Sequence, residues 1–132
     1  MRIGLGNDHH GIELKNRIIE YLKRNNIEYK NYGCDSKEDS ENIDFVDYAL
    51  NVCNGINNKE IDLGILICGT GIGMSIAANK VDNIMAAKVA TPREAHLCRD
   101  CAPSPCPCRP DCQSRGWRRQ RKRGWWARRI FP

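Results

Sequence analysis

The fold of this chain is decided by one stretch, ILICGTGIGMSIAANK at residues 65–80. An apolar run ends at Cys68, three glycines follow within five residues, and a helix-favouring segment begins. This order predicts a buried strand that ends at a thiol, then a glycine turn, then a helix. The N–H groups of the turn and the positive end of the helix would lie beside the sulfur. We therefore expect residues 68–73 to suit an anionic substrate and a thiolate base.

Strand and helix signals alternate on both sides of this stretch. The predicted strands are residues 2–6, 28–32, 62–68 and 84–89, and the predicted helices are residues 12–24, 45–53, 73–80 and 92–99. Helical spacing of apolar residues marks 12–24, and the 62–68 strand is apolar on both faces. The alternation predicts a parallel sheet covered by helices on both sides, with ligands at the carboxyl ends of the strands. Residues 7–11 and 68–73 both fall at such ends.

Charge and cysteine divide the 132 residues into two parts. Residues 1–98 contain 11 Lys and Arg against 14 Asp and Glu, whereas residues 99–132 contain 10 against 2. Four of the six prolines lie in residues 101–110, where their spacing forbids helix and central strand. We therefore predict an α/β domain at 1–100 and a Cys/Pro/Arg/Trp-rich tail without regular structure at 101–132.

Composition also limits which binding partners and which cellular compartment we expect for this protein. No apolar run approaches the ~18–20 residues needed to cross a bilayer, and the first residues read as a strand rather than a secretory leader. A cytoplasmic protein with free thiols is expected. The tail cysteines do not have the paired spacing of a zinc knuckle, so we expect no metal. Weak, non-specific attraction of polyanions is favoured over a nucleic-acid site in the tail.

Three motifs carry a resemblance to a known family: GNDH at residues 6–9, DFVDYA at 44–49, and GILICGTGIGMSIAANK at 64–80. Through these motifs, residues 2–99 resemble the type B ribose-5-phosphate isomerases, a family that also includes galactose-6-phosphate isomerase subunits. The resemblance implies a flavodoxin-like (Rossmann-like) three-layer α/β/α sandwich and a homodimer with shared active sites. It also implies a sugar-phosphate substrate, no cofactor, and a place in the pentose phosphate pathway.

The resemblance implies roles for particular residues. Cys68 would be the base that moves a proton between C2 and C1 through an enediolate, with the Thr70 hydroxyl and the N–H groups of the turn holding the developing charge. Asp8 and His9 would contact the sugar and its phosphate. The implied substrate-binding set is Asp8, His9, Gly69, Thr70, Gly71, Ile72 and Gly73. His10 stands where relatives often have a small residue, and it receives no role.

The resemblance ends near residue 99. Cys101 occupies the place of a ring-opening histidine, Ala102 that of an asparagine, and Phe45 that of a tyrosine. The family's next strand, its C-terminal helix and its phosphate-binding arginines have no counterpart, so we expect an uncovered fourth strand and activity below that of a full-length relative. Two alternatives stay open: a galactose-6-phosphate isomerase subunit, and a non-catalytic polyanion-binding protein.

Overall fold

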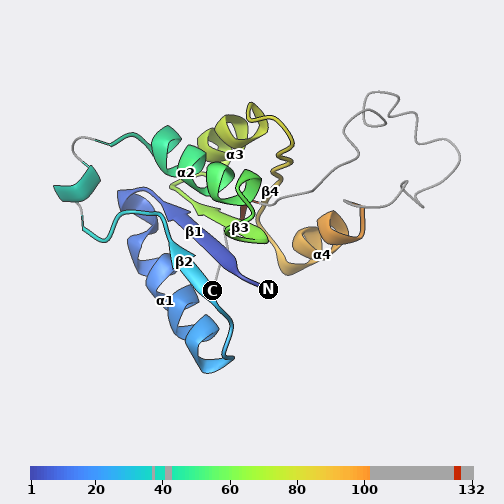
Figure 1. Cartoon of the computed structure of the whole chain (residues 1–132), viewed down its shortest axis with the longest axis horizontal. Helices are drawn as coiled ribbons and strands as arrows, with labels where there is room; N and C mark the ends of the chain where they lie inside the picture. Colours follow the sequence, from blue (N-terminus) through green and yellow to red (C-terminus); the bar gives the residue numbers. More distant parts are fainter. Residues whose placement is uncertain (37, 41–42, 102–126, 129–132) are drawn as a thin grey trace, which may run out of the picture.

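A computed structural model describes residues 1–36, 38–40, 43–101 and 127–128 of the chain (Figure 1). Its central sheet has the order β2-β1-β3, with all strands parallel; these strands are β1 (Ile3–Asn7), β2 (Tyr29–Asn31) and β3 (Leu63–Ile67). The helices are α1 (Ile12–Arg24), α2 (Phe45–Asn57), α3 (Ile72–Asn79) and α4 (Pro92–Cys101), with short 3-10 turns η1 (His9–Gly11) and η2 (Glu38–Ser40). The order 2-1-3 is the flavodoxin-like one, which places ligands between the ends of β1 and β3.

Side chains alternate across the sheet and build one core on each face. One core joins β1 and β3 to α1 and consists of Ile3, Leu5, Ile18, Leu22, Ile65 and Ile67. The opposite core joins Leu66 to α2 and α3, where Val52 and Met74 are among the buried side chains. Figure 1 shows α1 on one side of the sheet and α2 with α3 on the other. The predicted three-layer sandwich is therefore confirmed.

Two glycines let α2 approach the sheet closely. A Cβ on Gly6 would lie 2.8 Å from the Val52 Cγ2 atom, and one on Gly64 would lie 2.6 Å from Val52 Cγ1. Any larger residue at either position would push α2 outward, because a packed core has no free volume to absorb it. The glycines thus set the distance between the helix layer and the strands that carry the candidate site.

The helix α2 is longer than the sequence predicted. It begins at a capping box, in which the Asp44 carboxylate accepts the backbone N–H of Asp47 and the Asp47 carboxylate accepts the backbone N–H of Asp44. The helix runs to Asn57, whereas the sequence predicted an end at residue 53. Gly55 does not break it, because the ring of Tyr32 occupies the space beside that glycine: a Cβ there would lie 2.3 Å from the tyrosine oxygen. Tertiary packing outweighs the low helix propensity of glycine here.

The fourth strand differs from its prediction. Only Lys88–Val89 form β4, because the amide of Asn79 bonds both backbone groups of Ala86, at 2.7 and 2.9 Å, where strand pairing was expected. The strand is not an uncovered edge: it pairs in parallel with β5 (Ala127–Arg128), which also lies near β3. The sequence predicted no strand in this part of the tail. A two-residue strand pairs through its backbone and leaves no apolar pattern to detect.

The division at residue 100 stays a prediction, since most of the tail lies outside the described residues. Its cysteines at 106, 108 and 112 and its tryptophans fall there too. Among the helices of the described ranges, none is long and apolar enough to span a membrane.

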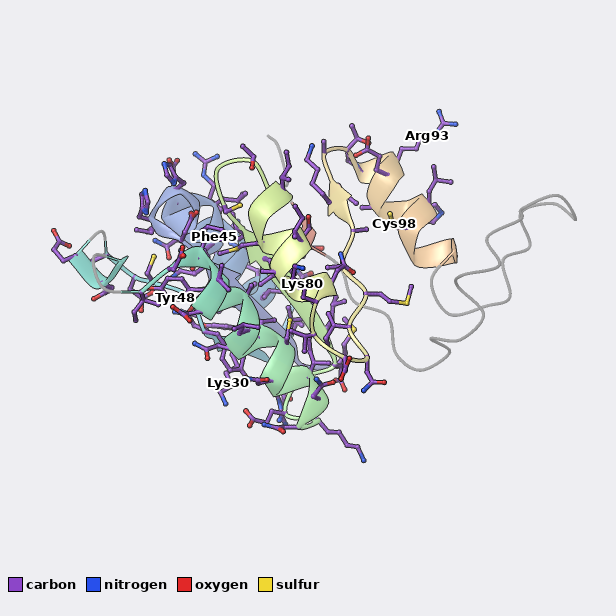
Figure 2. The ribbon with its side chains drawn as sticks, turned by 90° about the horizontal axis from the view of Figure 1, so that it is seen from above. Lys30, Phe45, Tyr48, Lys80, Arg93 and Cys98 are labelled. Atoms are coloured by element: carbon purple, nitrogen blue, oxygen red, sulfur yellow. The ribbon has the colours of Figure 1, made fainter. Side chains whose placement is uncertain are left out.

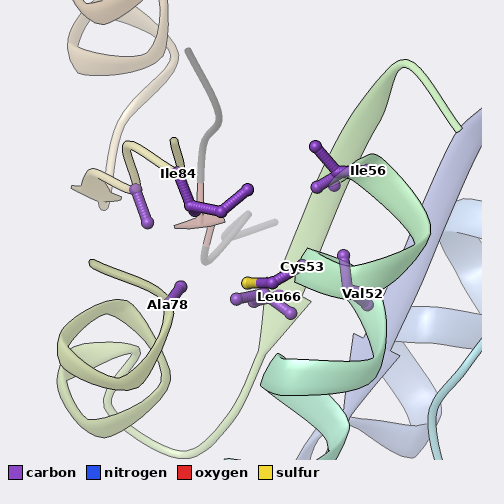
Figure 3. Close-up of a pocket in the computed structure, with 8 residues that line it drawn as sticks. Val52, Cys53, Ile56, Leu66, Ala78 and Ile84 are labelled. Atoms are coloured by element: carbon purple, nitrogen blue, oxygen red, sulfur yellow. The ribbon is translucent and has the colours of Figure 1, made fainter. Parts of the chain in front are cut away.

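An apolar pocket opens between α2, β3 and the segment before β4 (Figure 3). Its lining includes Val52, Cys53, Leu66, Ala78 and Ile84. Burial raises the pKa of the Cys53 thiol to about 11, since a charged sulfur is poorly solvated there. Cys53 is therefore a packing residue.

A buried lysine links α1 to the loop after β2. The Lys15 side chain has no exposed surface, and its ammonium donates to the Cys34 carbonyl at 2.6 Å and to the Asp35 carboxylate. The hydrogen bond from Lys15 to the Asp35 carboxylate lowers the pKa of Asp35 below its usual value near 3.8. The Asp35 side chain is 72% exposed, so solvent screens the pair.

We expect Asp35→Asn to reduce the free energy of unfolding at pH 7 by about 1 kcal/mol or less. Because the folded pKa of Asp35 is lowered, its stabilisation is complete above the unfolded pKa and is lost as pH falls through the folded value. Urea unfolding of both proteins from pH 7 to pH 2.5 measures this difference. Glu20→Gln is the control, because that carboxylate belongs to an exposed pair with Arg24. A difference that grows below pH 4 would contradict the assignment.

Candidate active site

Cys68 lies directly after β3, at the carboxyl edge of the sheet. Its side chain is partly buried, and its sulfur accepts the backbone N–H of Gly71 at 3.1 Å. The arrangement is the one that the order of residues 65–80 predicts: a thiol at the mouth of a strand, facing an amide of the following turn.

The turn between Cys68 and α3 is open to solvent. Gly69 and Thr70 are exposed, and Gly71 has φ +75°, a left-handed conformation that favours glycine. The Thr70 hydroxyl oxygen accepts the N–H of Ile72, the first residue of α3, at 3.3 Å. Two amides predicted to hold an anion, those of Gly71 and Ile72, thus donate to side chains of the turn itself.

The end of β1 brings three more predicted or neighbouring residues to the same edge. The N–H of Asp8 donates to the Ile67 carbonyl at 3.2 Å, which ties the end of β1 to the end of β3. The Asp8 carboxylate caps η1 by accepting the N–H of His10 at 2.9 Å. His9 is exposed, and its ring packs on that of His10 with centroids 3.9 Å apart.

Buried polar groups behind the site hold Asp8 in place. The side chain of Asn7 has no exposed surface, and its amide nitrogen donates to the carbonyl of Asp8 at 2.9 Å and to that of Cys34 at 3.1 Å. The same Cys34 carbonyl accepts from the ammonium of Lys15. Burial raises the pKa of the Cys34 thiol, so this sulfur is a structural one.

Three residues at the carboxyl edge of the sheet were assigned no role in the sequence analysis. The ring of His10 lies against Gly69, and Lys88 of β4 lies over Gly71, with its Cγ 3.2 Å and its Cε 4.0 Å from the place of a Cβ on that glycine. Phe45, at the start of α2 in Figure 2, covers Gly73 with its ring 2.8 Å from the corresponding position. A histidine doublet after the first strand was the available signal for His10. For Phe45 the signal was its place in the 44–49 motif, where it replaces a tyrosine, and Lys88 gave none.

We expect Gly71→Ala to lower the free energy of unfolding by about 1–2 kcal/mol, because a side chain strains the left-handed backbone. The new Cβ also crowds Lys88 and disturbs the N–H that faces the sulfur. Urea unfolding measures the loss. Gly69→Ala is the matched control, since its Cβ would meet nothing closer than 3.8 Å. Equal stabilities of the two variants would show that the positive φ is not maintained in solution.

No metal site is evident in the part of the chain that the structure describes, where no three His, Cys, Asp or Glu side chains gather closely enough. The groups that the described site presents are a thiol, a carboxylate, imidazoles and backbone amides.

Fold and site together define a Rossmann-like α/β protein with a cysteine and an amide turn at the switch point of its sheet. The chain belongs to the Ribose/Galactose Isomerase family, whose model matches residues 3–103. This confirms the predicted family resemblance.

Individual relatives agree with this assignment. A putative sugar phosphate isomerase of Bacillus subtilis is 46% identical over 87 residues, which are 66% of this chain and 57% of that protein. Ribose-5-phosphate isomerase B of Escherichia coli is 42% identical over 98 residues, which are 74% and 64% of the two chains. The chain thus spans roughly three fifths of the length of these relatives.

Solved structures match as well. Ribose-5-phosphate isomerase B of Clostridium thermocellum superposes with a TM-score of 0.71 at 40% identity, over 76% of this chain and 66% of that one. The enzyme of Thermotoga maritima superposes with a TM-score of 0.73 at 33% identity, over 96% of this chain and 72% of that one. These matches support the same fold over the part that holds Cys68.

Proposed function

We propose that this protein interconverts ribose 5-phosphate and ribulose 5-phosphate, with Cys68 as the base. One observation carries the proposal: the partly exposed sulfur of Cys68 accepts an amide N–H at 3.1 Å, at the edge where β1 and β3 end. Relatives that share this part of the chain are named ribose-5-phosphate isomerases. The reaction would belong to the pentose phosphate pathway.

In the proposed reaction the Cys68 thiolate removes the proton from C2 of the open-chain aldose. The C2–H electron pair forms a C1–C2 double bond, and the carbonyl electrons move to O1 to give an enediolate. Transfer of a proton from O2 to O1 and return of the Cys68 proton to C1 then yield the ketose. No proton or electron is gained or lost overall, so the chemistry needs no cofactor.

The turn supports the proposed intermediate. The backbone N–H groups of residues 69–73 and the Thr70 hydroxyl belong to the turn that follows Cys68, and they are proposed to hold the charge that develops on the enediolate oxygen. The N–H groups of Gly71 and Ile72 would exchange their acceptors in the turn for this oxygen. One such preorganised donor contributes about 3 kcal/mol to lowering a barrier. The ammonium of Lys88 adds positive charge on the same side. Asp8 and His9, at the end of β1, are proposed to hold the rest of the sugar phosphate.

A homodimer in the cytoplasm is part of the same proposal. Ile72 and Ile76 lie one turn apart on α3, and each is 54% exposed. Such an apolar stripe next to the site suits a second copy of the chain. Light scattering of the purified protein measures the mass, and a monomer at every concentration would refute this part.

A side-by-side turnover assay tests the function. Purified protein is given ribose 5-phosphate, allose 6-phosphate or galactose 6-phosphate, with the Escherichia coli relative as reference. We expect ribulose 5-phosphate to form, at a rate below that of the reference. Preference for galactose 6-phosphate would favour the other branch of the family. No turnover, together with salt-sensitive binding of nucleic acid, would favour the polyanion-binding alternative.

A further inference from the structure

The His10 side chain borders the candidate site at Gly69. Its ring carbon Cγ is 3.8 Å from the place of a Cβ on Gly69, the residue that follows Cys68. Its side chain is 59% exposed, so the ring borders the open mouth of the site rather than the core. An imidazole here is within reach of a molecule bound at Cys68.

Asp8 and His9 both lie beside this imidazole. The Asp8 carboxylate accepts the backbone N–H of His10 at 2.9 Å through Oδ1, and its Oδ2 lies 3.7 Å from Nδ1 of the ring. The Asp8 side chain is only 13% exposed, and the ring centroids of His9 and His10 lie 3.9 Å apart, with the two rings tilted by 41°. The Asp8 carboxylate thus lies on the Nδ1 side of the His10 imidazole, and Nε2 is the ring nitrogen on the side away from it.

The substrate class proposed above requires a step before Cys68 can act. A five-carbon aldose phosphate closes into a furanose, in which O4 is bonded to C1, and the C2 proton is acidic only when C1 is a free carbonyl. Because C1 is bonded to C2, a group that opens the ring has to lie beside the base that acts on C2. His10, packed on the neighbour of Cys68, meets this requirement.

We propose that His10, beside Asp8 and Gly69, opens the furanose ring of the substrate as a general acid–base residue. Nε2 removes the proton of the C1 hydroxyl, and the O–H electron pair forms the C1 carbonyl. The C1–O4 bond breaks, its electron pair moves to O4, and O4 takes the proton back from the imidazolium. The step leaves His10 neutral, and the open-chain aldose is delivered to Cys68. This inference depends on the proposed isomerase function.

The test compares a substrate that closes into a ring with one that cannot. 4-Deoxyribose 5-phosphate lacks the C4 hydroxyl, so it has no furanose form. We expect His10→Gln to lower kcat/KM for ribose 5-phosphate about a hundredfold and to leave that for the 4-deoxy compound within twofold. His96→Gln, an exposed histidine of α4, is the control and should change neither.

A second measurement keeps the inference testable if the 4-deoxy compound is a poor substrate. His10→Ala should regain activity on ribose 5-phosphate when imidazole is added, and circular dichroism should show an unchanged fold. Equal losses on both substrates, no loss on ribose 5-phosphate, or no rescue by imidazole would overturn the role of His10. Absence of turnover by the unaltered protein on either substrate would instead refute the isomerase function itself.

Discussion

Replacing Cys68 by serine should lower the rate of ribulose 5-phosphate formation about a thousandfold, the contribution of a well-placed acid–base group. Serine keeps an acceptor for the N–H of Gly71, so the turn should retain its geometry. Its hydroxyl does not supply an anion near neutral pH, whereas a thiol does. The change therefore removes the base while leaving the site in place.

Cys98→Ser on α4 is the matched control, since Cys98 is also partly buried and lies in another element (Figure 2). The control should keep the activity of the unaltered protein. Thermal unfolding should place both variants within a few degrees of it. A Cys68→Ser variant with undiminished turnover would remove Cys68 from its proposed role.

Leu5→Ala should lower the free energy of unfolding by about 3 kcal/mol, through lost burial and the cavity left behind. Leu5 has no exposed surface, and it packs with Ile65 and Ile67 beneath α1. Since β1 and β3 carry Asp8 and Cys68 at their ends, loosening this core should also weaken the site. Urea unfolding followed by circular dichroism measures the first effect, and turnover measures the second.

Leu97→Ala provides the comparison, because that side chain is 51% exposed and its loss should change stability by about 0.5 kcal/mol or less. A small and equal effect of both changes would mean that α1 does not pack on the sheet as described.

The central part of the fold could be predicted from the sequence because its signals are long and local. Residues 12–24 carry an amphipathic period and form α1 as predicted, and the apolar run before Cys68 forms β3. Of the strand predicted at 84–89, only Lys88–Val89 form a strand in the structure. The periodicity of the sequence does not reveal the reason. The backbone of Ala86 is bonded by a side chain, that of Asn79, rather than by a strand.

The candidate site likewise has one part that could be predicted from the sequence and another that could not. Cys68 and its turn are contiguous, so their proximity follows from local geometry. His10 and Lys88 reach the turn from η1 and β4, and their places depend on how these elements pack. The bonds that join Asn7, Lys15 and the Cys34 carbonyl are likewise tertiary. No pattern of residue types in one segment indicates them.

Hydrogen exchange at the sugar carbons tests the central claim most directly. Ribose 5-phosphate is incubated in D₂O with the unaltered protein or with Cys68→Ser, and deuterium is located by NMR. The proposed reaction predicts deuterium at C2 of recovered ribose 5-phosphate and at C1 of ribulose 5-phosphate. With Cys68→Ser the rate should fall to about a hundredth or less. Label appearing equally fast in that variant, or at neither carbon with the unaltered protein, would contradict proton transfer by Cys68.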